Sequence, residues 1–128
     1  MEDETLEVLL AGEKGEARLL APDSIEPEFF NVLWQQHRRK NLSLDEVGEY
    51  WSAFQGTPLY LTDVHSLVGR AARITTRTGA IIYDALFVAL AETEDGVMVT
   101  ADETLLKVLE GTPHAGLALS LAAWEDLT

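Results

Sequence analysis

The segment IIYDALFVALAE, residues 81–92, is the most apolar stretch of this chain and sets the interpretation of its neighbours. Its apolar run predicts a buried helix over residues 83–92. One acid, Asp84, interrupts it, and a carboxylate in such surroundings is costly unless something compensates for its charge. A purely structural explanation is an acid in the first helical turn, where the helix dipole favours negative charge. Asp84 is therefore a candidate for either role.

Short apolar runs alternate with helical periodicity on both sides of this segment. The helix before it ends at Gly79, and Ser43 with Glu46 forms a capping box that begins another. Helices are predicted over 3–11, 24–40, 43–54, 63–78 and 100–109, and strands over 17–21, 58–61, 96–100 and 117–121. This alternation predicts an α/β fold in which helices cover both faces of a parallel sheet.

Length and composition bound the class of protein. The chain has 128 residues, the size of a single domain, which we assign to 1–128. The absence of cysteine excludes disulfides, thiolate metal sites and a cysteine nucleophile. No apolar run is long enough to cross a membrane, and the acidic start is unlike a signal peptide, so we expect a cytoplasmic protein. A net charge of −13 argues against non-specific adhesion to nucleic acid but not against a nuclease that uses metal ions.

Three acids lie near the starts of predicted helices, namely Glu28, Asp84 and Asp102. Each of them, taken singly, also fits an acid that the helix dipole stabilises. Such positions can converge at one end of an α/β sheet, where ligands bind, and Asp23 and Asp63 also follow predicted strands. Clustered carboxylates raise one another's pKa or hold a cation, and oxygen ligands suit Mg²⁺ or Mn²⁺.

The motifs of common enzyme classes are missing from the sequence. It has no GxSxG, HExxH, GxGxxG or GxxxxGK[ST] stretch. The histidines lie far apart without metal-ligand spacing, and each is predicted to be a surface or helix residue: His37, His65 and His114. The acids are therefore the main candidates for chemistry.

Three segments carry a family resemblance. APDSIEPEFFNVLW (21–34), IIYDALFVALAE (81–92) and VMVTADETLLK (97–107) resemble, in this order, the successive motifs of the PIN-domain family, in particular the VapC-type toxins of prokaryotic toxin–antitoxin pairs. The resemblance extends from about residue 19 to about 121. It implies a three-layer α/β sandwich with a parallel sheet, an acidic pocket for Mg²⁺ or Mn²⁺, and endonucleolytic cleavage of RNA. It also implies a homodimer and a cognate antitoxin whose tail occupies a groove near the pocket.

The resemblance assigns roles residue by residue. The acid of the family's E-x-x-N motif falls on Glu28, with Asn31 as its companion. The YDA acid falls on Asp84, and the T-x-D acid falls on Asp102, with Thr100 as its polar neighbour. The three acids are thus the implied catalytic residues and metal ligands, supported by Asn31 and Thr100.

The sequence departs from the family at its start. The family's first strand ends in an Asp and lies in the middle of the sheet, and no residue before Glu28 matches it. We therefore expect a PIN-like fold with its N-terminal strand missing, which leaves the strands 17–21 and 96–100 without their shared neighbour. Three explanations compete: a misassigned start site, which we favour, a degenerate chain, or another segment or subunit that fills the gap.

Basic and aromatic side chains suggest further surfaces. Arg70, Arg73 and Arg77 form one helical stripe that fits phosphate contacts, a solvated face or ion pairs within the chain. The basic run 37–40 ends a predicted helix, where the dipole favours cations. We expect four aromatic residues in the core: Trp34, Tyr50, Trp51 and Phe54.

Two functions follow as hypotheses. The first is a metal-dependent endoribonuclease, the toxin of a type II pair, which hydrolyses RNA with metal-activated water. The second is a non-catalytic or degenerate PIN-like module that only binds a partner protein. The missing first acid favours the second hypothesis, and the presence of Glu28, Asp84 and Asp102 favours the first.

Overall fold

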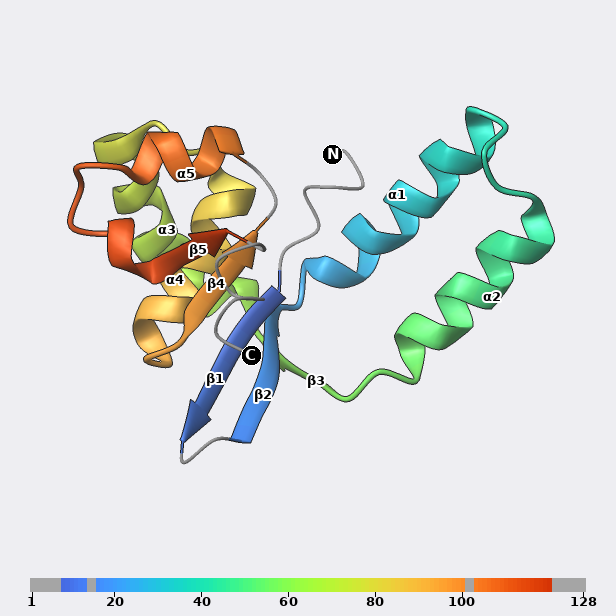
Figure 1. The fold of residues 1–128 in the computed structure, drawn as a ribbon, viewed down its shortest axis with the longest axis horizontal. Coiled ribbons are helices and arrows are strands. Elements are labelled where there is room, and N and C mark those ends of the chain that lie inside the picture. The colour runs from blue at the N-terminus through green and yellow to red at the C-terminus, as the bar shows by residue number, and fades with distance from the viewer. Residues whose placement is uncertain (1–7, 14–15, 101–102, 121–128) are drawn as a thin grey trace.

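The structure, a computed structural model, describes residues 8–13, 16–100 and 103–120 (Figure 1). Its strands are β1 (Val8–Glu13), β2 (Glu16–Pro22), β3 (Leu59–Thr62), β4 (Val97–Thr100) and β5 (Ala118–Ser120). Its helices are α1 (Ile25–Arg38), α2 (Leu44–Gln55), α3 (Val64–Thr78), α4 (Ile82–Thr93), α5 (Glu103–Leu109) and the 3₁₀ turn η2 (Ala115–Leu117). Strands and helices alternate along most of the chain, which confirms the predicted α/β class.

The strands form one sheet in the order β3-β2-β1-β4-β5. The outer pairs are parallel, with Leu19 opposite Leu59 in β2 and β3, and Met98 opposite Ala118 in β4 and β5. The central strand β1 is antiparallel to both of its neighbours, and its Leu9 lies opposite both Leu20 and Met98. The sheet is therefore mixed, and the prediction of a parallel sheet is correct only for the outer pairs.

Strand β1 corrects two expectations about the start of the chain. Residues 8–11 are not helical, and the place between β2 and β4, expected to lack its strand, is filled by another segment of the same chain. Only residues 14–15 separate β1 from β2, and so short a connection joins antiparallel strands, whereas a parallel pair needs a long crossover. The run VLLA is apolar at every position, as expected for a strand in the middle of a covered sheet.

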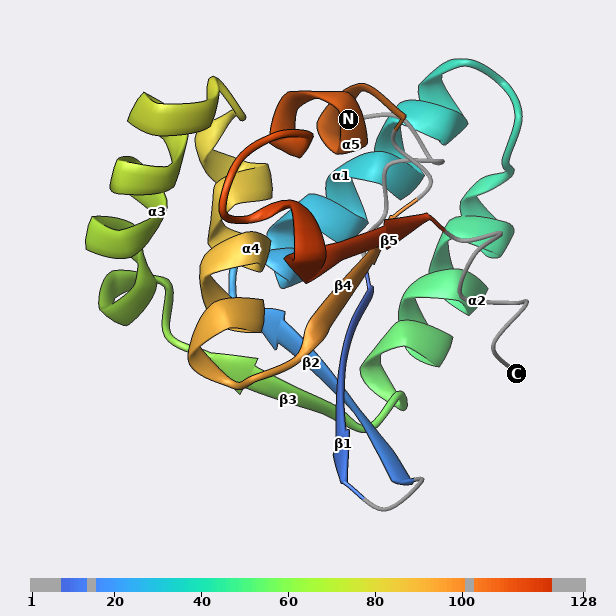
Figure 2. The same ribbon diagram turned by 60° about the vertical axis from the view of Figure 1, so that its left-hand side comes forward.

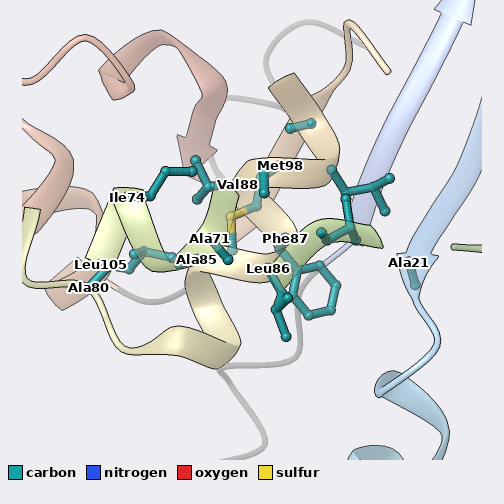
Figure 3. Close-up of a cluster of buried hydrophobic side chains, with 14 of the residues drawn as sticks. Ala21, Ala71, Ile74, Ala80, Ala85, Leu86, Phe87, Val88, Met98 and Leu105 are labelled. Carbon is teal, nitrogen blue, oxygen red and sulfur yellow. The ribbon is translucent and has the colours of Figure 1, made fainter. Parts of the chain in front are cut away.

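Helix α4 forms the centre of the hydrophobic core and confirms the helix predicted from the apolar segment. Every residue of α4 from Asp84 to Ala91 is buried, and the helix packs across β1, β2 and β4. Figure 3 shows part of this core, in which Ile74 from α3 and Met98 from β4 lie beside α4. Burial on all sides explains why α4 has no polar face.

Helices α3 and α4 form a bent pair. Gly79 ends α3 in the left-handed conformation, with φ of 82°, as predicted. Figure 2 shows α3 on the outer side of α4, away from the strands. Leu67, Ala71 and Ile74 supply its buried face. Within the described residues, no single helix combines the length and the apolar character needed to cross a membrane.

Helices α1 and α2 form a hairpin on the side of β1 and β2 opposite to α3, α4 and α5 (Figure 1). The predicted capping box of α2 is confirmed, because the Ser43 hydroxyl accepts from the Glu46 N–H and the Glu46 carboxylate accepts from the Ser43 N–H. The rings of Phe29 and Phe54 stack between the two helices with centroids 4.4 Å apart. Trp51 stacks on Phe54 at 5.4 Å.

The position of this hairpin corrects the expectation of core burial for Trp34 and Tyr50, whereas Phe54 packs against the hydrophobic core. Trp51 and Phe54 are half-buried between α1 and α2, but Trp34 and Tyr50 remain 42% and 51% exposed. The two helices pack chiefly on each other, so each keeps a face that no other described element covers.

Candidate functional site

Glu28 lies in the first turn of α1, which begins directly after β2. Its side chain is half-buried, and its Oε1 atom is fully buried without a hydrogen-bond partner among the described residues. Ser24 occupies the N-cap position of α1, but its hydroxyl makes no capping hydrogen bond. This hydroxyl oxygen is also buried without a hydrogen-bond partner among the described residues. Two buried oxygen atoms one helical turn apart therefore make no hydrogen bond of regular geometry, although the Ser24 hydroxyl lies close enough to influence Glu28.

Asp84 occupies the first turn of α4 and is buried, with 9% of its surface exposed. It comes close enough to Glu28 for the two carboxylates to interact. Burial is the main cause that raises the pKa of Glu28, and the negative charge of Asp84 raises it further. The nearby Ser24 hydroxyl lowers this pKa, although the two groups do not meet in a hydrogen bond of regular geometry. The structure thus brings together two of the three predicted acids, from helices far apart in the sequence.

The raised pKa of Glu28 predicts how stability depends on pH without added metal. At a pH below 4.5, the ordinary pKa of a glutamate, Glu28 is protonated in both the folded and the unfolded chain, so burial of its charge does not lower the stability of the fold. As the pH rises above 4.5, the unfolded chain releases this proton first, so the folded state loses stability. We therefore expect Glu28→Gln to melt a few degrees above the wild type at pH 7 in EDTA and at the same temperature near pH 4. A difference that does not change with pH would contradict the burial of a charged Glu28.

The described donor atoms suit a hard cation. Glu28, Asp84 and Ser24 offer only oxygen atoms, the ligands that Mg²⁺ and Mn²⁺ prefer, and Oε1 of Glu28 makes no regular hydrogen bond among the described residues. Among the described residues, no group of three His, Cys, Asp or Glu side chains is placed to hold a metal ion. Asp102 lies outside those residues, and of Thr100 the structure describes the backbone, which ends β4.

Asn31 lies one turn after Glu28 and is exposed. It lines a shallow groove on α1 together with Pro27, Phe30 and Trp34. Its amide makes no hydrogen bond within the part of the chain that the structure describes. Its role as companion of Glu28 therefore stays a prediction.

The other acids that follow strands have structural roles. Asp23, after β2, accepts a hydrogen bond through Oδ1 from the Val64 N–H at 3.1 Å. Asp63, after β3, accepts one from the His65 N–H at 3.1 Å and so caps α3. Both carboxylates thus hold the start of α3.

The arginine stripe of α3 is partly occupied within the chain. Arg70 forms an ion pair with Glu92 at the far end of α4 from Asp84, which confirms for this residue the alternative of an internal ion pair. Arg73 and Arg77 are exposed and form no ion pair in the described ranges. The other oxygen of Glu92 lies 3.6 Å from Nδ1 of His114, whose burial contradicts its prediction as a surface or helix residue.

Sequence reasoning missed Ser24. The available signal was its position four residues before Glu28 across the start of a helix, a spacing that places two side chains on one face. No protein-family model matches the sequence, and the comparison with curated proteins finds no significant similarity. The geometry of Glu28 and Asp84 is therefore the main support for a function.

Proposed function

We propose that this protein is a PIN-like, metal-dependent endoribonuclease whose centre is built on Glu28 and Asp84. The observation that carries the proposal is the meeting of these two carboxylates in a partly buried position, one with an unpartnered oxygen. Two neighbouring carboxylates, one buried and one half-buried, raise each other's pKa, and a cation bound between them would offset their repulsion. Asp102 is proposed as the third acid, with Thr100 and Asn31 in support, from the sequence alone.

The chain's own residues suit hydrolysis of a phosphodiester. Glu28, Asp84 and Asp102 would hold Mg²⁺ or Mn²⁺, which when bound lowers the pKa of a coordinated water and offsets charge on the phosphate oxygens. Glu28 would act as a ligand of the ion or would orient one. Ser24, whose hydroxyl lies close to Glu28, would orient this carboxylate.

The biological setting is proposed from the resemblance. It comprises an RNA substrate, a homodimer, a cognate antitoxin and the role of toxin in a type II pair, in a three-layer PIN-like sandwich. The support is the order of the three motifs; the sheet also has a strand between β2 and β4, but this strand is antiparallel, whereas the resemblance implies a parallel sheet.

A non-catalytic PIN-like binding module is the second candidate, and one observation favours it. Strand β1 runs antiparallel to β2 and β4, so Val8 lies at the edge of the sheet where β4 ends, opposite Val99. The acid of β1, Glu13, pairs with Glu16 at the other edge. The described part of the central strand therefore has no acidic residue at the edge of the sheet where β4 ends.

A metal titration separates the two candidates. The purified chain is mixed with labelled RNA in EDTA, in Mg²⁺ and in Mn²⁺, and its melting temperature is measured under the same conditions. A nuclease is expected to cleave only with the divalent ion and to melt at a higher temperature when the ion binds. Neither cleavage nor a melting shift at millimolar metal would refute the nuclease and leave the binding module.

A further inference from the structure

Two shallow grooves follow each other along the exposed face of α1. The first is lined by Pro27, Phe30, Asn31 and Trp34. The second is lined by Trp34, His37, Arg38 and Lys40. Because Trp34 belongs to both, they form one continuous surface that begins beside Glu28 and ends in cations. By helix geometry the part of this surface from Pro27 to Arg38 is about 16 Å long, a distance that a few nucleotides of a single strand cover.

The basic end of this surface is held in a defined geometry. The Nδ1–H of His37 donates to the Leu42 carbonyl at 2.9 Å, and its ring lies 5.3 Å from that of Trp34. The Trp34 ring is therefore supported on one side and 42% exposed. Lys40 turns the chain out of the helix with φ of 65°, and its N–H donates to the His37 carbonyl at 2.9 Å.

We propose that this face of α1 is a track for single-stranded RNA, in which bases stack on Trp34 and phosphates lie at Arg38 and Lys40. The inference rests on the proposed function, because the track leads the strand to the Glu28–Asp84 pair. An exposed aromatic ring next to cations is the combination that binds single strands without sequence preference. A duplex does not offer its base faces to such a ring.

The distribution of charge favours RNA as the ligand of this α1 surface. The chain carries nine Lys and Arg residues against 22 acids, and three of the nine are consecutive at 38–40. Arg38 and Lys40 form no ion pair among the described residues, whereas Arg70 of the α3 stripe is already paired with Glu92. A phosphate chain is thus drawn to the end of α1 and repelled by most of the remaining surface.

The test measures binding of a fluorescent single-stranded oligouridine in EDTA, so that it does not depend on cleavage. Trp34→Ala is expected to weaken binding about 5- to 150-fold, the effect of removing one stacking platform, and Trp34→Phe to weaken it much less. Lys40→Gln is expected to lower the slope of log affinity against log salt by about 0.7, the share of one phosphate contact on a single strand. Lys107→Gln, an exposed lysine on α5, is the matched control and leaves the slope unchanged.

A second variant separates loss of the track from loss of folding. Lys40→Gly removes the charge at a position where the backbone favours glycine, so it is expected to bind RNA more weakly and to melt no lower than the wild type. The proposal would be overturned if Lys40→Gln and Lys107→Gln had equal slopes of log affinity against log salt, or if Arg77→Gln changed this slope more than Lys40→Gln. It would also be overturned if Trp34→Ala bound the oligouridine as tightly as the wild type, or if duplex RNA competed as well as single-stranded RNA. The two proposals fail separately. RNA cleavage with metal and an unchanged KM in Trp34→Ala would overturn only the track, and binding through Trp34 without any cleavage would overturn only the nuclease.

Discussion

Replacement of Asp84 by Asn is expected to abolish metal-dependent cleavage of RNA, with a loss of about 10²–10³-fold or more, as when a preorganised charge-stabilising group is removed. Asn keeps the shape of the side chain but not its charge, so the site would lose a proposed ligand, and Glu28 would lose the neighbour that helps raise its pKa. The folded chain is relieved of one carboxylate repulsion. In EDTA the variant should therefore melt no lower than the wild type.

The melting temperature makes this prediction independent of activity. Addition of Mn²⁺ is expected to raise the melting temperature of the wild type and to leave that of Asp84→Asn almost unchanged. Asp45→Asn is the matched control, because it makes the same change at an exposed acid in the first turn of α2. Full activity in Asp84→Asn, or an equal response of the two variants to Mn²⁺, would remove Asp84 from the site.

Replacement of Leu90 by Ala is expected to destabilise the fold by about 2–5 kcal/mol, the usual cost of truncating a fully buried leucine. Leu90 is 0% exposed in α4, which packs on three strands and on α3. Small domains have a total stability of only about 5–15 kcal/mol, so a sizeable fraction is lost. Urea denaturation followed by circular dichroism measures the change.

The same substitution at an exposed leucine is the control. Leu44 is 61% exposed at the start of α2, and Leu44→Ala is expected to change the free energy of unfolding by less than about 0.5 kcal/mol. Similar losses for Leu90→Ala and Leu44→Ala would show that α4 is not the buried centre of the molecule.

Elements with local signals are predicted well from the sequence. The capping box of Ser43 and Glu46 and the stop at Gly79 depend only on neighbouring residues, and both are confirmed. The apolar run of α4 is also confirmed, because burial on all sides needs no periodicity. Strand β1 could not be predicted in this way. Apolar residues at 6, 9 and 10 fit a helical face as well as a strand, and only distant pairing with β4 decides between them.

In the candidate site, too, some features have a signal in the sequence and others depend on contacts between distant elements. The resemblance predicted that Glu28 and Asp84 share a role, and the structure brings them together through the packing of α1 and α4 beside the sheet. The prediction for Asp102 concerns a residue outside those that the structure describes. Ser24 and the surface around Trp34 escaped prediction because burial of a hydroxyl and exposure of a tryptophan depend on neighbours from other elements.

The central position of β1 also determines the order in which the protein can fold as it leaves the ribosome. The β1–β2 hairpin is complete after residue 22, but the other edge of β1 pairs with β4, which ends at Thr100. Loops of this length close slowly. Until β4 has been synthesised, the nascent chain therefore exposes one edge of an apolar strand, and this edge is a site at which chaperones can bind or aggregation can begin.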